Sequence, residues 1–415
     1  MTKVDILFHP VGQGLFSSGH IRANGSRFDW TYDCGSDSPG KLEDEAVDRL
    51  WHEMAADNSM PILDFVFISH FDLDHISGIP HLLRRFRVEE LVVPLVPLWR
   101  RLLLVLNVGS AITHFQLDFL LDPIGAIARV EGANVGRILL VPPRGSAPSV
   151  DGAQFIDDIQ PSNRQNDLPG RITYQVDLEN SNRALPIGDD PVVASHPPLR
   201  VMKQGGRIRV DGFWEFLPYN DALYTKKVDS KFVRKANQIR VRLLQTQSPT
   251  IRNLLLQVLK RHYERKFISA STRNGISLFV YAGLVGANGT VCACDWPVDT
   301  SCFYPTYCIG QARGRGFLFT GDGDLKAKRR WKDLETYMGK YRAGHLLALQ
   351  VMHHGSKNNW HPGLAQSIAA GLAVFAADPA HKLAHPDHNV LVNFSSQGPT
   401  ALVDKHTGCR LQFFF

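Results

Sequence analysis

The chain has 415 residues, of which 44% are hydrophobic and 21% are charged. This composition is typical of a globular protein with a normal core, and it excludes a largely disordered chain. The formal net charge of +6 favours anionic partners. We find no apolar stretch suited to a signal peptide or a membrane span, so we expect a soluble, cytoplasmic protein with no membrane partner.

The first part of the chain predicts strands followed by helices. Strands are expected over residues 4–8, 15–21, 28–32, 63–69 and 90–93. The fourth of these is a short apolar run rich in β-preferring residues, which suits a buried strand. A helix is expected over 42–54, because apolar residues recur there at helical spacing, and another over 79–86.

The middle of the chain is less regular. A helix near 112–121 is followed by a polar, Pro/Gly-rich stretch over 145–190, which we expect to form long loops or an insertion. A β-hairpin is expected over 199–217, with Gly205-Gly206 at its turn. Residues 226–266 are expected to be helical and strongly basic. The remaining strands are expected over 276–282, 316–320, 347–352, 372–376 and 411–415.

The strongest chemical signal follows the strand expected over 63–69. The next residues include four side chains that can bind metals: His70, Asp72, Asp74 and His75. Because a strand end is rigid and the loop beyond it can turn side chains to one point, this segment predicts a metal site rather than a solvated polar loop. Imidazole and carboxylate together suit Zn, Mn or Fe better than Ca.

Two distant segments add candidate ligands. One expected apolar strand ends at Asp322, and another ends at the pair His353-His354. Taken alone, Asp322 could cap a turn or a helix, and the two histidines could lie in an ordinary loop. Three strands that each deliver metal ligands at their C-terminal ends form a constellation that is hard to obtain by chance.

These motifs resemble the metallo-β-lactamase superfamily, and within it the hydrolase domain of the ComEC/Rec2 DNA-uptake proteins and its soluble relatives. The matching residues follow the family's order: Val11-Gly12-Gln13-Gly14, Tyr32-Asp33-Cys34-Gly35, His70-Phe71-Asp72-Leu73-Asp74-His75, Asn274 with Ser277-Leu278, Thr320-Gly321-Asp322, His353-His354-Gly355-Ser356-Lys357 and His385-Pro386. The match covers roughly residues 1–95, 196–220 and 270–415 of one expected single domain. Residues 96–195 and 222–268 are then poorly matched insertions.

The resemblance implies an α/β fold of the αββα sandwich type, with a two-metal site at one edge of the sheets. His70 and Asp72 would hold one divalent ion, Zn or Mn, and Asp74 and His75 the other. Asp322 would bridge the two ions. One of His353 and His354 would complete the set, and we favour His353 because it directly follows the strand. Asp72 stands where the familiar signature has His, which argues against a true β-lactamase.

The resemblance also implies catalytic roles, and the clustered basic residues of 226–266 add candidates for substrate binding. Asp74 would also orient the attacking water, and His385 would contact the scissile group or protonate the leaving group. The alternative for His385 is a loop histidine beside a proline. Candidate substrate-binding residues for an anionic substrate are Ser356, Lys357, Lys226, Lys227, Lys231, Arg234 and Lys235. The alternative for the basic segment is the solvated face of a helical insertion.

A metal-dependent phosphodiesterase or nuclease is the favoured function, because clustered Lys and Arg attract phosphate, including that of nucleic acid. A hydrolase of small esters, lactones or thioesters is the alternative enzyme, and a non-catalytic binding module is the third reading. The segment with Cys292, Cys294, Cys302 and Cys308 allows an extra structural zinc, although Cys-x-Cys departs from the commoner spacing. Its alternative is a set of half-buried residues in a hairpin insertion.

Overall fold

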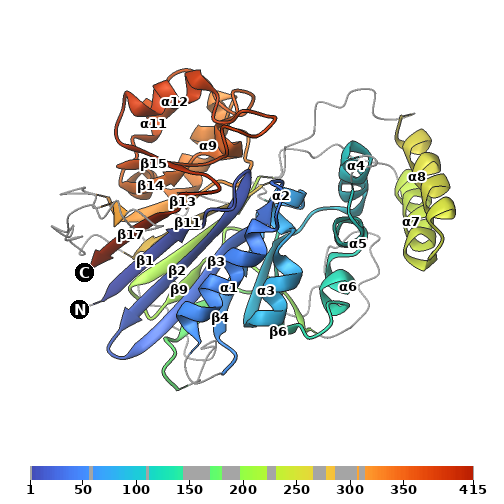
Figure 1. Ribbon diagram of the computed structural model, residues 1–415, viewed down its shortest axis with the longest axis horizontal. Helices are drawn as coiled ribbons and strands as arrows, with labels where there is room; N and C mark the ends of the chain where they lie inside the picture. The colour runs from blue at the N-terminus through green and yellow to red at the C-terminus, as the bar shows by residue number, and fades with distance from the viewer. Residues whose placement is uncertain are drawn as a thin grey trace.

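The computed structural model describes residues 2–55, 59–108, 112–143, 169–179, 197–221, 230–264, 277–285, 306–307 and 314–414. These residues form an α/β fold with two mixed β-sheets flanked by helices (Figure 1). One sheet has nine strands and the other has eight. Among the described helices, none combines the length and apolar character needed to cross a bilayer.

The nine-stranded sheet holds the first strands of the chain and its last one. Its order is β12 (Thr306–Tyr307), β17 (Cys409–Phe414), β1 (Lys3–Phe8), β2 (Gly14–Ala23), β3 (Ser26–Ser36), β4 (Ile62–Phe67), β5 (Arg87–Pro94), β6 (Asn134–Val141) and β8 (Leu199–Val201). Strand β1 pairs antiparallel with β17, so the two ends of the chain lie side by side (Figure 1). From β3 to β8 all neighbours run parallel, and their C-terminal ends therefore share one edge of the sheet.

The eight-stranded sheet is built mostly from the second half of the chain. Its order is β16 (Thr400–Val403), β15 (Leu372–Ala376), β14 (Leu346–Gln350), β13 (Gly316–Phe319), β11 (Leu278–Leu284), β10 (Trp214–Asn220), β9 (Ile208–Val210) and β7 (Tyr174–Val176). Strands β13 to β16 run parallel. Their C-terminal ends also share one edge, which is where the predicted ligands follow β13 and β14.

Three hydrophobic clusters separate the layers. One lies between the sheets, where Trp30 packs edge-on against Phe216 with ring centroids 5.2 Å apart. The second lies under the helices on the nine-stranded sheet: α1 (Leu42–Met54), α2 (Leu73–Ile76), α3 (Ile79–Arg85), α4 (Leu98–Val108), α5 (His114–Leu121) and α6 (Pro123–Ala128). The third lies under α9 (Lys328–Met338), α10 (Lys340–Ala343), α11 (Leu364–Ile368) and α12 (His388–Ser395). This layering is consistent with the αββα sandwich that we expected.

Local sequence explains the elements that were easiest to predict. Helix α1 has the predicted bounds, and its buried side chains Ala46, Leu50 and Met54 recur every four residues, as an amphipathic helix requires. Its first turn is acidic, which complements the positive end of the helix. Strands β1, β4 and β15 likewise fall within two residues of their predicted ranges.

The chain does turn at Gly205, where the Gly206 amide donates to the Lys203 carbonyl at 2.8 Å, but the prediction that this turn closes a β-hairpin is wrong. The strands on either side of it, β8 and β9, belong to different sheets. The hairpin is formed by β9 and β10, and its turn holds Asp211 and Gly212 with φ of 42° and 74°. Left-handed backbone at both positions matches the twist of the paired strands, and Asp-Gly is a preferred sequence for such a turn. The glycine pair marks a crossing between the sheets.

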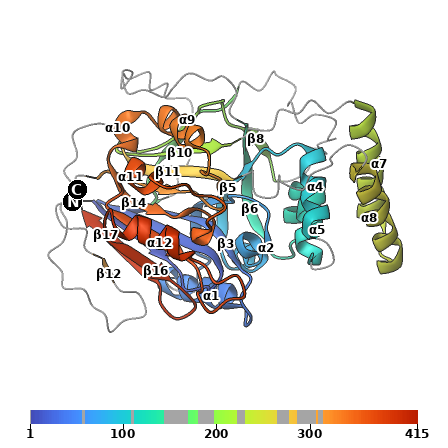
Figure 2. The ribbon, with the colours of Figure 1, turned by 90° about the horizontal axis from the view of Figure 1, so that it is seen from above.

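The basic insertion is helical where it is described. It forms the hairpin of α7 (Ser230–Gln245) and α8 (Pro249–Glu264), which lies outside α4 and α5 at one end of the molecule (Figures 1 and 2). Helix α4 packs Leu102 and Val105 into the core, as an ordinary core helix does. Of the stretch expected as loops over 145–190, only 169–179 is described, and it carries β7.

Candidate metal centre

The predicted ligands converge at the edge where the parallel strands of both sheets end. His70 follows β4, Asp74 and His75 lie in α2, and Asp72 directly precedes α2. Asp322 follows β13, and the turn η3 (Met352–Gly355) follows β14 and carries both His353 and His354. The two sheets each contribute part of one buried His/Asp cluster, which could hold metal ions.

Two groups of side chains share Asp322. The first consists of His70, Asp72 and Asp322, and the second of Asp74, His75, Asp322 and His354. In each group the candidate ligand atoms lie within 4.8 Å of one another. Oδ2 of Asp322 is 3.6 Å from Nε2 of His70, and Oδ1 of Asp322 is 3.1 Å from Nε2 of His75. The carboxylate of Asp322 therefore faces each group with a different oxygen.

The rings of His75 and His354 are fixed by hydrogen bonds on the side away from the cluster. Nδ1 of His75 donates to Oδ2 of Asp33 at 2.8 Å, and Nδ1 of His354 donates to the Ala376 carbonyl at 2.5 Å. Nε2 of each ring then points into the cluster. Such outer hydrogen bonds set the tautomer and the orientation of metal-binding histidines.

His70 is fixed in the same way through Ser69. The Ser69 hydroxyl donates to Oδ2 of Asp33 at 2.6 Å, so its oxygen accepts from Nδ1 of His70 at 2.8 Å. The Ser69 amide also donates to Oδ1 of Asp33 at 2.6 Å. One fully buried carboxylate thus orients two candidate ligands.

Asp33 is the residue at this site that sequence reasoning did not assign a role. It belongs to the matching segment Tyr32-Asp33-Cys34-Gly35, but its contacts with Ser69 and His75 span 36 and 42 positions of the chain. Asp33 also groups with His70 and His75 by distance. Because both of its oxygens already accept hydrogen bonds, we regard it as a positioning residue rather than a ligand.

Unsatisfied atoms show that this cluster fits cations. Nε2 of His70, Nε2 of His75 and Oδ1 of Asp322 are buried, and none of them forms a hydrogen bond within the described part of the chain, although the last two lie 3.1 Å apart. Leaving a buried polar atom without a partner costs about 1–3 kcal/mol. Three such atoms that face one another, all of types that bind Zn or Mn, are explained if a metal occupies the centre.

The aspartates and histidines of the cluster shift one another's pKa values. Burial alone would raise the pKa of Asp74, but the charge of His75 and a hydrogen bond from His354 lower it to about 2. Burial also opposes ionisation of Asp322, yet the neighbouring histidines, His353 foremost, hold its pKa well below the usual range. Burial would lower the pKa of His75, but Asp322 and Asp74 raise it well above 6.5. Without metal, the cluster therefore holds protons where cations would bind.

The histidine pair has an unusual backbone. His353 and His354 both have left-handed φ, of 46° and 55°. Such a conformation costs on the order of 1–3 kcal/mol per residue, and it persists where surrounding contacts impose it. Here the His353 amide donates to the Gly321 carbonyl at 2.9 Å. The turn places His354 within the second ligand group. From sequence we favoured His353 as the ligand, and its Nδ1 lies 2.8 Å from Oδ2 of Asp322.

Close backbone contact explains one glycine of the matching segments. A Cβ atom on Gly35 would lie 2.4 Å from the amide nitrogen of His75 and 2.6 Å from the carbonyl carbon of Asp74. Strand β3 can therefore approach the ligand loop only with glycine at this position. The side-chain amide of Gln116 in α5 also donates to the Phe71 carbonyl at 3.2 Å. Contacts with β3 and α5 thus both position the loop that carries four candidate ligands.

The other predicted site residues lie at varied distances from this cluster. The ring centroid of His385 is 6.0 Å from that of His353, and burial, together with the two neighbouring histidines, lowers the pKa of His385 to about 4. Ser356 is buried beside η3, while Lys357 is exposed and lies 3.6 Å from Asp387. A neutral His385 at pH 7 can donate one hydrogen bond but is not a cationic acid.

The predicted basic residues that the structure describes lie away from the cluster. Lys231, Arg234 and Lys235 are exposed on α7, beyond α4 and α5 (Figure 2). Lys226 and Lys227 lie outside the described residues. The same holds for the cysteines considered for a structural zinc, which are Cys292, Cys294, Cys302 and Cys308.

Comparison with known proteins does not assign the chain to a family. No protein-family model matches the sequence, and no curated protein shows significant similarity to it. The chain is therefore defined by its fold and its site: two mixed sheets with flanking helices, and a buried His/Asp cluster that could bind metal ions.

Proposed function

We propose that this chain is a metal-dependent hydrolase of the metallo-β-lactamase fold that cleaves phosphodiesters. The observation that carries the proposal is the position of Asp322 between two ligand groups. A carboxylate shared in this way is suited to hold two cations side by side. Two cations so placed would supply an activated water and would neutralise the charge of the attacking and leaving oxygens.

The residues of the chain have separate tasks in this proposal. His70 and Asp72 would hold one cation, and Asp74, His75 and His354 the other, with Asp322 between them. The side chains of Asp72 and Asp74 are 29% and 20% exposed, whereas that of His75 is fully buried. Substrate would therefore approach from the side of the two aspartates. Asp74 is also the carboxylate suited to orient the attacking water.

Charge favours a phosphodiester over a neutral ester. Exposed Lys231, Arg234 and Lys235 on α7 provide positive charge away from the cluster. Such a surface suits a substrate that extends beyond the scissile bond, as a nucleic acid does, because each neutralised phosphate releases counterions. A small ester or lactone would not reach this helix.

The experiment combines metal analysis with a phosphodiester substrate. Purified protein loaded with Zn or Mn is expected to cleave bis-p-nitrophenyl phosphate, and Asp74→Asn and Asp322→Asn are expected to abolish cleavage. Asp211→Asn is the matched control, because Asp211 lies in an exposed turn with left-handed φ that Asn also adopts. Its activity should equal that of the unmodified protein.

The outcomes separate the alternatives. Cleavage of carboxylic esters without cleavage of any phosphodiester would overturn the substrate class but not the hydrolase. Tight metal binding without turnover of either substrate would indicate a binding module. For a nucleic acid substrate, replacing Lys231, Arg234 and Lys235 with Gln should weaken binding and reduce its salt dependence. The control replaces exposed Lys203, Lys332 and Lys340, which should have little effect.

A further inference from the structure

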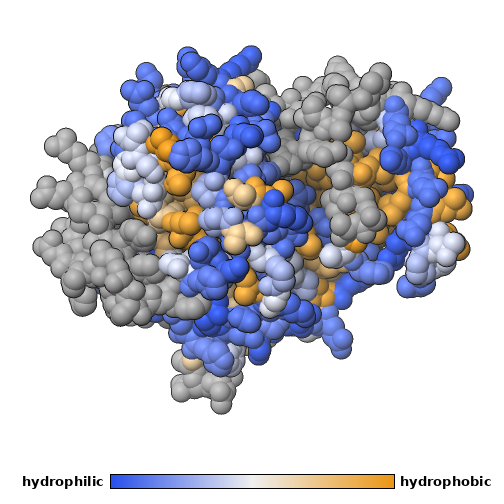
Figure 3. All heavy atoms as spheres, turned by 45° about the horizontal axis from the view of Figure 1, so that its top comes forward, coloured by the Kyte–Doolittle hydropathy of each residue, from blue (hydrophilic) through white to orange (hydrophobic). Residues whose placement is uncertain are grey.

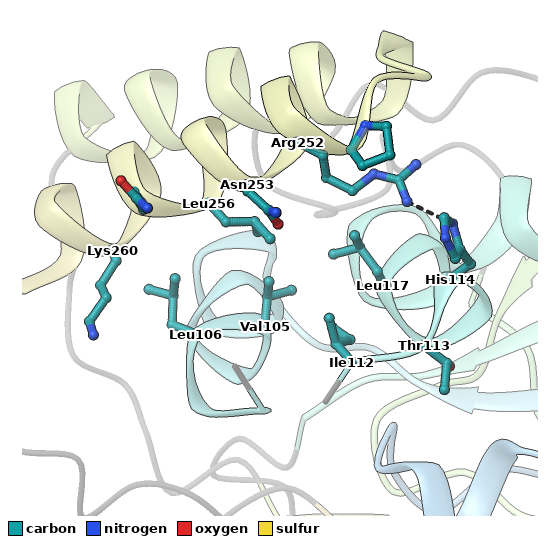
Figure 4. A pocket seen from close by; sticks show the side chains of 12 residues that line it. Val105, Leu106, Ile112, Thr113, His114, Leu117, Arg252, Asn253, Leu256 and Lys260 are labelled. Carbon is teal, nitrogen blue, oxygen red and sulfur yellow. Dashed lines mark hydrogen bonds between the residues drawn. The ribbon is translucent and has the colours of Figure 1, made fainter. Parts of the chain in front are cut away.

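A cavity separate from the metal centre lies between α8 on one side and α4 and α5 on the other (Figure 4). Its volume is about 540 Å³, which is within the range of small-molecule sites. Figure 3 shows hydrophobic residues gathered at the end of the molecule that carries these helices. The cavity follows α8 from Arg252 to Lys260, a distance of about 12 Å at the helical rise. It therefore runs along about two turns of α8.

The walls combine an aliphatic surface with positive charge. The aliphatic side chains are Val105, Leu106, Ile112, Leu117 and Leu256. Arg252 and Lys260 contribute the charge, and the residues described as lining the cavity include no Asp or Glu. An apolar wall without carboxylates, next to a guanidinium, is complementary to a ligand with an apolar body and an anionic head.

Arg252 is positioned to receive that head. Its Nη1 donates to Nδ1 of His114 at 2.7 Å, because a guanidinium has donors only. This hydrogen bond holds the side chain across the space between α8 and α5 (Figure 4). Nε of Arg252 is buried and has no acceptor among the described residues. Helices α5 and α8 also both begin at this end of the cavity, so their positive ends add to the same potential.

Lys260 has a different environment. Its side chain is 64% exposed and lies 3.9 Å from the carboxylate of Glu264. The aliphatic residues lie between Arg252 and Lys260 in Figure 4. The cavity is thus polarised, with a partly buried cation at one end, an apolar middle and an open, charge-balanced far end.

We infer that this cavity binds an amphipathic anion, with its head on Arg252 and its apolar chain along the aliphatic wall toward Leu106. The ligand class is a medium-length chain with a single anionic head. The inference is independent of the hydrolase proposed above, because none of the residues that line the cavity belongs to the metal cluster.

Decanoate is the probe, with decanol as the neutral partner of equal chain length. Both are titrated calorimetrically into the full-length protein, before and after chelation of metals. Decanoate is expected to bind at one site with the same affinity in both preparations. Arg252→Gln should weaken decanoate binding about tenfold, the scale of one hydrogen bond to a charged group, and leave decanol binding unchanged.

Arg261→Gln is the matched control, since Arg261 is exposed on the same helix and does not line the cavity. It should bind decanoate like the unmodified protein. Absence of saturable decanoate binding would overturn the inference, as would equal weakening by Arg261→Gln. Binding that disappears on chelation would also overturn it, because the carboxylate would then be a ligand of the metal centre. Circular dichroism of each variant shows whether it is folded.

Discussion

Oδ2 of Asp33 accepts a hydrogen bond from Nδ1 of His75 at 2.8 Å, with both side chains fully buried. The interaction joins β3 to the helix that follows β4. It leaves Nε2 of His75 as the atom that faces the metal cluster. Asp33 therefore controls the geometry of a ligand without being placed to act as one.

Replacing Asp33 with Asn tests this role. Asn keeps the size and tolerates the left-handed φ of 55° at this position, but it removes the charge that stabilises the His75 N–H. We expect metal affinity to fall about 10–100-fold, as it does when the outer partner of a metal ligand is lost. Competition with a chromogenic chelator measures the affinity, and Asp211→Asn is the control. An unchanged affinity would contradict the role.

Variants of the histidine pair distinguish their tasks. His354 belongs to the second ligand group, with Nε2 3.1 Å from Oδ2 of Asp74. Nδ1 of His353 lies 2.8 Å from Oδ2 of Asp322. We expect His354→Ala to lose more metal affinity than His353→Ala, by at least about tenfold. Elemental analysis after dialysis gives the retained metal. The reverse order would assign the ligand to His353.

Metal should stabilise the folded protein through Asp322. A ligand that binds only the folded state raises the unfolding free energy by about 2.7 kcal/mol when it is present at 100 times its Kd. We expect this increase in thermal or denaturant unfolding of the unmodified protein and not of Asp322→Asn. Each protein is compared with and without metal, so that any change in intrinsic stability cancels. An equal increase in both would show that the metal binds elsewhere.

Metal affinity should rise with pH across the neutral range. The pKa of His75 is raised above 6.5 by its carboxylate neighbours, so the metal-free folded protein holds a proton there that a cation must displace. The pKa of Asp74 is about 2, and this carboxylate is therefore ionised throughout and adds no slope. Each released proton makes the affinity change about tenfold per pH unit. Calorimetry in buffers of different ionisation enthalpy counts the protons, and a pH-independent Kd would refute the expectation.

The same raised pKa has a consequence for the metal-free protein. Above pH 6.5 the folded state binds more protons than the unfolded chain, so its unfolding free energy should decline as the pH rises toward the pKa of His75. Chelated protein should lose stability on this alkaline side, and metal-loaded protein should not. Denaturant titrations at several pH values measure both.

Gly35→Ala tests the close approach of β3 to the ligand loop. The added methyl would meet backbone atoms of Asp74 and His75, which cannot move without shifting both side chains. We expect a loss of about 1–3 kcal/mol in unfolding free energy together with weaker metal binding. Gly398→Ala is the control, because its Cβ would meet no atom closer than 3.7 Å. A Gly35→Ala protein with full metal affinity would contradict the contact.

Sequence was sufficient for features encoded locally. The ligand loop and the strands before it were predictable, because apolar runs and the residues that end them are adjacent in the chain. The layering of helices on sheets followed only from the resemblance. The metallo-β-lactamase assignment and the site roles remain proposals, although the described cluster contains His70, Asp72, Asp74, His75, Asp322 and His354.

Features that depend on distant contacts could not be predicted. Asp33 acquires its role only when β3 lies beside β4. Which of His353 and His354 joins a ligand group depends on left-handed backbone at both residues, and the residue types do not predict this conformation. Gly205-Gly206 resembled a hairpin turn, and only the pairing of β8 with β6 shows that the chain changes sheets there. The cavity between α8 and α4–α5 arises from packing between segments without a recognisable motif.

The division of the cluster between the two sheets has a consequence for assembly. The nine-stranded sheet supplies His70 and the α2 residues, and the eight-stranded sheet supplies Asp322 and His354. Neither sheet alone provides all the residues of either ligand group. Binding of a cation would therefore require that the two sheets have already packed together, and the bound cation would then link the two layers.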